Sequence, residues 1–504
     1  MSKLVTRKDT RLSTPRARTG CQTCRKRHIK CDESTPSCLK CIQAGWKCDG
    51  YTTLKLARGN NNTIIRASMT SAHSITSYSI PFRIPGSQKD RQIFHYLCVQ
   101  GSSEIAGSLD SGFWSRTVLQ ESHQEPVVLK ALISLGSLHL DYTTTTTPGN
   151  IVAKSETLAA YGRALRALQK RLQKPDPETF KASLVCCVLF FCFEATLGNS
   201  NAALNHLESG LKLLSSYRQV HGYEKIEDIR DLSHIFERLD LQATLFNDGR
   251  VPFLDLVADD DLSFTPAAER ISRLDDAYRP LLRLQHWLSR FLTKNMAYKF
   301  LQKEDIPDHI LVEKEQIVRQ MNSWMSKFGG QAYRGDQTGC ATQILLLQWR
   351  ASCMLLDANY PTNEDVFEAC PNLRAEEIMA LAGDVIRLTK ERNIASDTAK
   401  SAQREFSSDT AVVAPLFLLA MKCSDQSIYA RATELLEVCQ RREGLYDSRC
   451  MASTLRQLRA MKPDELVHAA NRPIAESENQ SLENLRAYEL NQRTGGMDSI
   501  VDFI

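Results

Sequence analysis

Six cysteines with a repeated spacing constrain the N-terminus of this chain more than any other feature. Residues 21 to 48 read CQTCRKRHIKCDESTPSCLKCIQAGWKC and hold six of the sixteen cysteines of the 504-residue chain. The gaps between successive cysteines are two, six, six, two and six residues, so the stretch contains two copies of a Cys-x2-Cys-x6-Cys unit. This duplication predicts two similar turns that each present a pair of thiolates, with a third thiolate arriving from the end of a short segment.

The number of thiolates predicts a shared metal site. Tetrahedral zinc takes four ligands, and thiolates select zinc over magnesium or calcium. Six sulfurs satisfy two zinc ions only if two of them bridge, and the repeat makes Cys21 and Cys38 the natural bridges. His28 lies between ligands, but six sulfurs already close the site. The predicted cofactors are two zinc ions, with the ligands Cys21, Cys24, Cys31, Cys38, Cys41 and Cys48.

Two other uses of the cysteines are disfavoured. Disulfides require an oxidising compartment, whereas the N-terminal sequence MSKLVTRKDTRLSTPRAR has no apolar run of the kind that a signal peptide needs. An iron–sulfur cluster uses four cysteines rather than six. The longest apolar stretch, residues 184–193, is far shorter than the roughly 20 residues that span a bilayer, and it predicts a buried helix.

Positive charge is concentrated around the cysteines. Residues 1–50 hold twelve Lys and Arg against four Asp and Glu, a net charge of +8 in a chain whose total is +4, so the other residues sum to −4. The sequence RKRHIK between Cys24 and Cys31 is almost entirely basic. A basic patch favours a nucleic-acid partner, although basic segments also serve nuclear import or stay solvated. A short helix carrying these side chains would be held rigid by metal rather than by a hydrophobic core.

The cysteine stretch resembles the zinc binuclear cluster of fungal transcription regulators. The resemblance implies a fungal source and two short helices, each starting near the first cysteine of its half. It also implies a joining loop with a proline two residues before the fourth cysteine, where Pro36 stands. Members of that family use the first and fourth cysteines as bridging ligands, in agreement with the stoichiometric argument.

The same resemblance implies a way of reading DNA. In related regulators the residues three and four after the second cysteine reach base edges in the major groove, typically at a CGG triplet. Here these are Arg27 and His28, with histidine where a lysine is familiar. Several neighbours are expected to contact phosphates and to add salt-dependent affinity. The predicted DNA-binding residues are Arg18, Arg25, Lys26, Arg27, His28 and Lys30. Trp46 is expected to pack against the cluster rather than to stack on a base.

The rest of the chain predicts an all-α body behind a linker. The linker is rich in Asn, Ser and Thr and contains no three-heptad repeat, which leaves a monomer and a homodimer both open. Beyond it, apolar residues recur at helical spacing, and Asp176 followed by Pro177 indicates a helix start. The predicted domains are a basic tail (1–20), the zinc cluster (21–50), the linker (51–88), a helical regulatory domain (89–470) and a C-terminal tail (471–504).

Four stretches of the helical body resemble the regulatory domain that accompanies one large group of binuclear-cluster proteins. They read SGFWSRTVLQESHQEPVVLKALISLGSLH, AAYGRALRALQKRL, NAALNHLESGLKLL and FERLDLQATLF. Phe113 and Trp114 are expected to be core anchors, and His206 to be a structural histidine. The body contains no nucleophile-elbow, P-loop, dinucleotide-binding or zincin motif, so the chain is not predicted to be an enzyme.

The predicted function is a nuclear, sequence-specific regulator of transcription by RNA polymerase II. Its expected partners are double-stranded DNA with CGG-type sites and the transcription machinery or co-regulators, with no membrane. The resemblance implies metabolic control, often of a secondary-metabolite gene cluster. Two rivals stay open: an enzyme in the helical body with a zinc module for localisation, and a zinc-dependent RNA or protein adaptor. The final MDSIVDFI is interpreted as a frayed tail rather than an activation segment.

Overall fold

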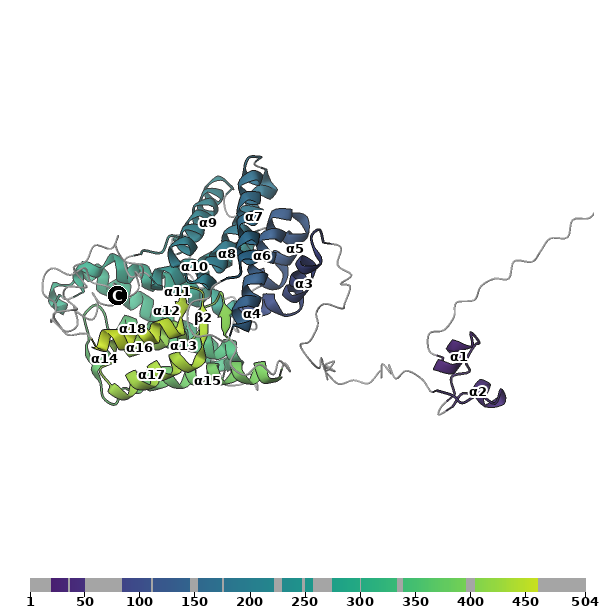
Figure 1. Cartoon of the computed structure of the whole chain (residues 1–504). Helices are drawn as coiled ribbons and strands as arrows, with labels where there is room; N and C mark the ends of the chain where they lie inside the picture. Colours follow the sequence, from purple (N-terminus) through teal and green to yellow (C-terminus); the bar gives the residue numbers. More distant parts are fainter. Residues whose placement is uncertain are drawn as a thin grey trace, which may run out of the picture. The chain divides into compact units, whose positions relative to one another are not determined.

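The chain divides into two compact units, residues 1–69 and residues 70–504. The computed structural model (Figure 1) describes residues 20–34, 37–49, 84–109, 112–145, 153–174, 176–221, 229–246, 250–256, 274–299, 301–332, 339–395 and 404–460. Outside these ranges lie nearly all of the predicted basic tail with Arg18, and also Pro36, most of the predicted linker and the C-terminal tail with its MDSIVDFI sequence.

The N-terminal unit contains two short helices that repeat each other. α1 (Gln22–Lys26) begins after Cys21, and α2 (Leu39–Gln43) begins after Cys38. Each of these cysteines caps its helix, because its Sγ accepts a hydrogen bond from the backbone N–H three residues later at 3.3 Å. Sulfur atoms take the place of a hydrophobic core, since the buried side chains among the described residues of this unit are four cysteines and Thr23.

The larger unit consists of helices arranged in two halves. Within its first half α8 lies between α6 and α9 and packs against both, while α7 packs on α6. One buried apolar core fills this half and includes Phe113 and Trp114, as predicted. The elements of the first half are α3 (Gln88–Tyr96), η2 (Leu97–Gly101), α4 (Ser102–Ala106), η3 (Phe113–Thr117), α5 (Val118–Gln124), α6 (Pro126–Thr144), α7 (Ser155–Leu172), α8 (Pro177–Leu197), α9 (Ser200–His221) and α10 (Arg230–Phe246).

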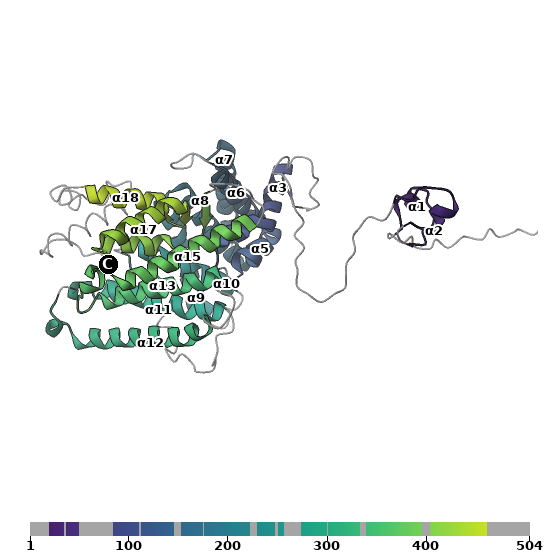
Figure 2. The same cartoon turned by 90° about the horizontal axis from the view of Figure 1, so that it is seen from below.

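The second half has a core of its own. Figure 2 shows α11, α12, α13 and α15 side by side, and neighbouring members of this set are in contact. Their apolar faces surround large buried side chains such as Phe291, Trp324 and Tyr360. The helical elements of this half are α11 (Leu274–Lys294), η5 (Met296–Tyr298), η6 (Lys303–Asp305), α12 (Asp308–Ala332), α13 (Cys340–Asp357), α14 (Asp365–Glu368), α15 (Leu373–Ala395), α16 (Val413–Lys422), α17 (Gln426–Cys439) and α18 (Ser448–Ala460).

α8 carries the longest apolar stretch of the sequence. Within the described ranges, Glu178–Leu197 is the one helix long and apolar enough to cross a membrane, but 83% of its apolar window is buried inside the protein. Its start matches the predicted signal, because Asp176 accepts a hydrogen bond from the backbone N–H of Thr179 at 2.7 Å. Its end is set by Gly198, whose φ of +85° suits glycine. The buried helix predicted over residues 184–193 is therefore confirmed.

The all-α prediction is confirmed, with the addition of a small sheet that the sequence did not reveal. β1 (Glu405–Ser407) pairs in parallel with β2 (Arg441–Glu443), which pairs antiparallel with β3 (Tyr446–Asp447). Strands of two or three residues are too short to show the alternation by which strands are recognised in a sequence.

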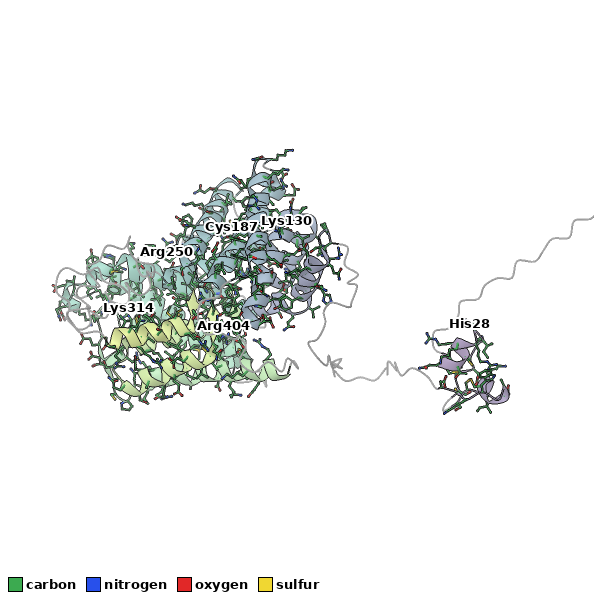
Figure 3. All side chains as sticks on the ribbon, in the orientation of Figure 1. His28, Lys130, Cys187, Arg250, Lys314 and Arg404 are labelled. Carbon is green, nitrogen blue, oxygen red and sulfur yellow. The ribbon has the colours of Figure 1, made fainter. Side chains whose placement is uncertain are left out.

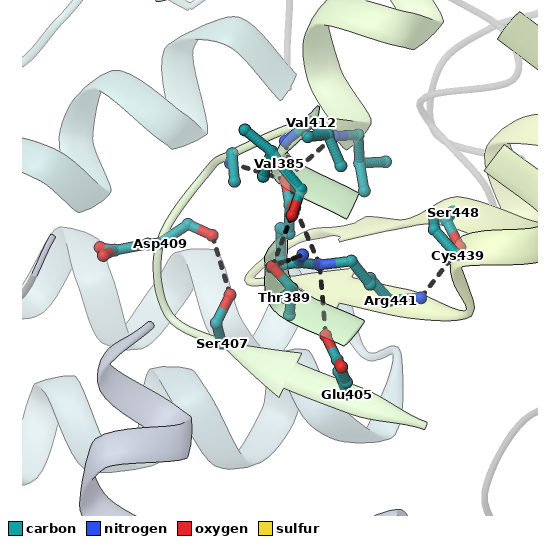
Figure 4. Close-up of polar contacts among 12 residues, drawn as sticks. Val385, Thr389, Glu405, Ser407, Asp409, Val412, Cys439, Arg441 and Ser448 are labelled. Atoms are coloured by element: carbon teal, nitrogen blue, oxygen red, sulfur yellow. Dashed lines mark hydrogen bonds and ion pairs between the residues drawn. The ribbon is translucent and has the colours of Figure 1, made fainter. Parts of the chain in front are cut away.

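A buried carboxylate on β2 caps the start of α16. Glu443 is fully buried and accepts hydrogen bonds from the backbone N–H groups of Ala411, Val412 and Val413 at 2.7, 3.1 and 3.0 Å. Its Oε1 also lies 3.4 Å from Nε of Arg441, whose guanidinium hydrogen-bonds Thr389 (Figure 4). A carboxylate is stabilised by the exposed N–H groups at a helix N-terminus, so β2 and α16 support each other.

The segment that follows β1 joins the two halves of the larger unit. Ser408 Oγ accepts a hydrogen bond from Nε1 of Trp114 at 3.0 Å, and the Ser408 N–H donates to the carbonyl of Ile105 at 2.7 Å. Asp409 accepts from the backbone N–H of Leu109 at 3.1 Å and forms a buried ion pair with Arg238 of α10. The two cores are thus tied together by buried polar contacts.

Candidate zinc centre and nucleic-acid interface

The six cysteine sulfurs gather into two groups of four. One group is Cys21, Cys24, Cys31 and Cys38, and the other is Cys21, Cys38, Cys41 and Cys48. Within each group the sulfurs lie within 4.8 Å of one another. Cys21 and Cys38 belong to both groups, which is the arrangement expected of bridging ligands. These are the groups of three or more His, Cys, Asp or Glu suited to a metal in the part of the chain that the structure describes.

The sulfur spacing fits tetrahedral zinc. Four sulfurs at about 2.3 Å from a central zinc lie about 3.8 Å from one another. The Sγ–Sγ distances are 3.5 Å for Cys24 and Cys38, 3.6 Å for Cys21 and Cys38, and 3.8 Å for Cys21 and Cys41. Burial raises the pKa of these four thiols, so a cation is needed to hold them as thiolates. The residues present therefore suit zinc and would depend on it for folding.

Each half closes toward its third cysteine by the same backbone turn. In the first half, the Ile29 N–H donates to the carbonyl of Cys24 at 3.1 Å, after His28 at a φ of +56°. In the second half, the Trp46 N–H donates to the carbonyl of Cys41 at 2.9 Å, after Gly45 at a φ of +68°. These residues occupy equivalent places in the sequence repeat. The repeat of the cysteine spacing thus extends to the backbone conformation.

Asp32 joins the two halves and was not anticipated from the sequence. Its carboxylate accepts hydrogen bonds from the Ser34 hydroxyl and from the backbone N–H groups of Leu39 and Lys40, the latter two at 3.0 and 3.1 Å. The hydrogen bonds, with that of Ser34 the largest contribution, hold the pKa of Asp32 well below its usual range. Because Leu39 and Lys40 form the first turn of α2, Asp32 caps that helix from the connecting loop.

The predicted DNA-binding residues other than Arg18 lie on and directly after α1. Arg25, Lys26, His28 and Lys30 are exposed, and His28 is labelled on this unit in Figure 3. Lys26 lies 3.7 Å from Asp49, but its side chain is 75% exposed, so the pair contributes little stability. These side chains remain open to solvent, as phosphate contacts require.

Arg27 differs from the other basic residues on and after α1. It is half-buried, and its guanidinium carbon lies 4.9 Å from the centroid of the Trp46 ring. Trp46 was expected to pack against the cluster, yet 56% of this residue is exposed and its ring contacts Arg27. The spacing of the two residues in the sequence gave no sign of this contact, because it depends on the path of the loop after α2.

Two features of the described part of the helical body bear on catalysis. His206 Nε2 lies 3.1 Å from the Tyr161 hydroxyl and its ring lies near Phe190, and burial lowers its pKa, as fits a structural histidine. A mainly apolar cavity of about 150 Å³ lies among α10, α11, α13 and α16. Its lining contains no His, Cys, Asp or Glu and so offers no general acid or base of these types.

Two families match this chain. The fungal Zn(2)-Cys(6) binuclear cluster domain matches residues 19–58, and the fungal specific transcription factor domain matches residues 91–437. The second match covers more than half of the chain and includes most of the helical body. No solved structure matches the chain.

Several fungal regulators are similar in sequence. The aspercryptin biosynthesis cluster-specific transcription regulator of Emericella nidulans is 23% identical over 86% of this chain and 85% of its own length. A transcription regulator of Purpureocillium lilacinum is 29% identical over 38% of this chain and 48% of its own. White-opaque regulator 2 of Candida albicans is 52% identical, but over only 9% of this chain and 10% of its own.

Proposed function

Because the chain belongs to the family of fungal Zn(2)-Cys(6) transcription regulators, we propose that its N-terminal unit binds two zinc ions and reads CGG-containing duplex DNA. The observation that carries this proposal is the pair of four-sulfur groups that share Cys21 and Cys38. With one zinc in each group, both ions have four sulfur ligands and all six cysteines are used. Members of this family are transcription regulators rather than enzymes.

α1 and the turn that follows it are the proposed reading element. Arg27 and His28 would face base edges in the major groove, since they lie where α1 ends and the chain reverses. Arg25, Lys26 and Lys30, together with Arg18, would contact phosphates and give affinity without specificity. The exposure of Arg25, Lys26 and Lys30 leaves their charged groups accessible to phosphate oxygens.

The helical body would control the activity or the partners of the bound regulator in the nucleus. We assign it residues 89–470, behind a linker at 51–88, with residues 21–50 as the DNA-binding domain. The similarity to a regulator of aspercryptin biosynthesis along most of both chains supports a role in regulating metabolic genes, in particular a secondary-metabolite gene cluster. RNA polymerase II transcription, co-regulators and a homodimer on paired sites belong to the same proposal.

Replacement of one non-bridging ligand tests the zinc cluster. We expect Cys31→Ala to lose metal and to lower affinity for a CGG duplex to the non-specific level, roughly 10³-fold or more at fixed salt. Native mass spectrometry would give the zinc count of the full-length protein, and fluorescence anisotropy its duplex affinity. Cys98→Ala is the matched control, because Cys98 is exposed on η2 in the helical body. Full zinc content and unchanged affinity in Cys31→Ala would show that the cluster assignment is wrong.

A further inference from the structure

The contact between Arg27 and Trp46 distinguishes one of the five described basic residues of the reading element. The guanidinium carbon of Arg27 lies 4.9 Å from the indole centroid, a cation–π distance. Its Nη1 is buried and makes no hydrogen bond with the protein. This donor is therefore covered by the protein without being paired. The other four basic residues, Arg25, Lys26, His28 and Lys30, are exposed.

Backbone contacts fix both members of the pair. Arg27 is the C-cap of α1, and its N–H donates to the carbonyl of Thr23 at 3.0 Å. The Trp46 N–H donates to Cys41, and the buried Thr23 hydroxyl donates to the carbonyl of Lys47 at 3.1 Å. The same hydroxyl accepts from the N–H of Asp49 at 2.9 Å. Thr23 therefore ties the segment that carries Trp46 to the helix that carries Arg27.

Because Trp46 is largely exposed, its ring contributes little hydrophobic stabilisation to the N-terminal unit. Trp46 is 56% exposed, whereas a buried aromatic ring stabilises a fold through the area that it removes from water. Its ring does, however, restrict a side chain that otherwise has four rotatable bonds and a large rotamer entropy to lose on binding. A platform that restricts Arg27 before binding reduces that loss.

We propose that Trp46 is a positioning residue for DNA recognition: it holds the Arg27 guanidinium in the orientation used to read a base. This inference rests on the proposed function of α1 as the reading element. A guanidinium is planar by itself, and a ring contact on one side limits how that plane can turn. Bidentate contact with O6 and N7 of guanine requires the plane to be aligned with the base edge. Trp46 thereby acts on base discrimination through Arg27, without touching the base.

A double-mutant cycle on the zinc-loaded full-length protein tests the proposal. The variants are Trp46→Leu, Arg27→Ala and the double variant, with Trp46→Tyr as a conservative replacement that keeps an aromatic face. Affinity is measured for the duplex selected by the unsubstituted protein and for the same duplex with its guanines replaced one at a time. Zinc content and the salt dependence of affinity are measured in parallel.

We expect Trp46→Leu to reduce discrimination at one guanine about fivefold, the size of a single cation–π contact. Zinc content and salt slope should stay unchanged, and Trp46→Tyr should keep most of the discrimination. In the Arg27→Ala background, Trp46→Leu should have no further effect on discrimination.

Three results would overturn the proposal. The first is full discrimination in zinc-replete Trp46→Leu, and the second is an additive effect in the double variant. The third is loss of zinc in both Trp46→Leu and Trp46→Tyr, which would assign Trp46 a purely structural role. If the unsubstituted protein selects no duplex sequence at all, the proposed function fails, and that failure is recognised before any variant is compared.

Discussion

His28 combines a predicted DNA contact with a backbone conformation that most side chains avoid. Its φ of +56° matches that of Gly45 at the equivalent place in the second half. Histidine, asparagine and aspartate are the non-glycine residues that enter this region most readily. A histidine at this position therefore suits the turn that returns the chain to Cys31. The sequence showed a histidine at this position but could not indicate the positive φ that His28 adopts.

Substitutions at His28 should separate backbone strain from side-chain chemistry. His28→Val places a β-branched residue in the left-handed region, at a cost of about 1–2 kcal/mol. Zinc retention against a competing chelator should weaken by roughly 5- to 30-fold, since zinc binding and folding of this unit are coupled. His28→Asn should retain zinc as well as the unsubstituted protein. Equal retention in the valine and asparagine variants would contradict this account of the turn.

Much of the metal site could be predicted from its residues, because six sulfurs give two tetrahedral ions four ligands each only if two of the sulfurs are shared. Bridging by Cys21 and Cys38 followed from stoichiometry and the repeat, and the grouping of the sulfurs has that form. Asp32 and the contact of Trp46 with Arg27 could not be predicted. Both depend on how loops bring together residues that no spacing rule connects.

Among the elements, α16 shows how a helix can depend on a distant residue. Its first N–H groups donate to Glu443, which follows α17 in the sequence, rather than to a local capping residue. Local signals were sufficient for α8, where Asp176 and Pro177 predicted the start. They were insufficient for α16 and for the three short strands, which form only when the tertiary structure aligns them.

Removal of the charge at Glu443 should destabilise the helical body. In Glu443→Gln, glutamine has nearly the same shape as glutamate, but one carboxylate oxygen becomes an NH2 group that faces backbone N–H donors. The loss of the negative charge also removes the buried ionic partner of Arg441. We expect a loss of about 3 kcal/mol in the free energy of unfolding, from urea denaturation followed by circular dichroism. Glu434→Gln, at an exposed position of α17, should change it by less than about 0.5 kcal/mol. Similar losses in both variants would contradict a specific capping role.

In the whole molecule, the two units are stabilised by different kinds of interaction. Residues of the N-terminal unit surround sulfur atoms, whereas two apolar cores joined through Ser408 and Asp409 hold the helical body. Composition and periodicity predicted this division, because cysteines and positive charge are concentrated at one end and helical spacing at the other. The link between the two cores could not be predicted, since its partners lie far apart in the sequence.

Selection from a random duplex DNA library would show whether the protein reads a DNA sequence only when zinc is bound. The zinc-loaded full-length protein and a chelated sample would be compared at one salt concentration, because affinity for DNA is strongly salt-dependent. We expect the zinc-loaded protein to enrich a CGG-containing motif, and we expect chelation to abolish that enrichment. Enrichment of no sequence by a protein that retains its zinc, or the same enrichment after chelation, would contradict this expectation.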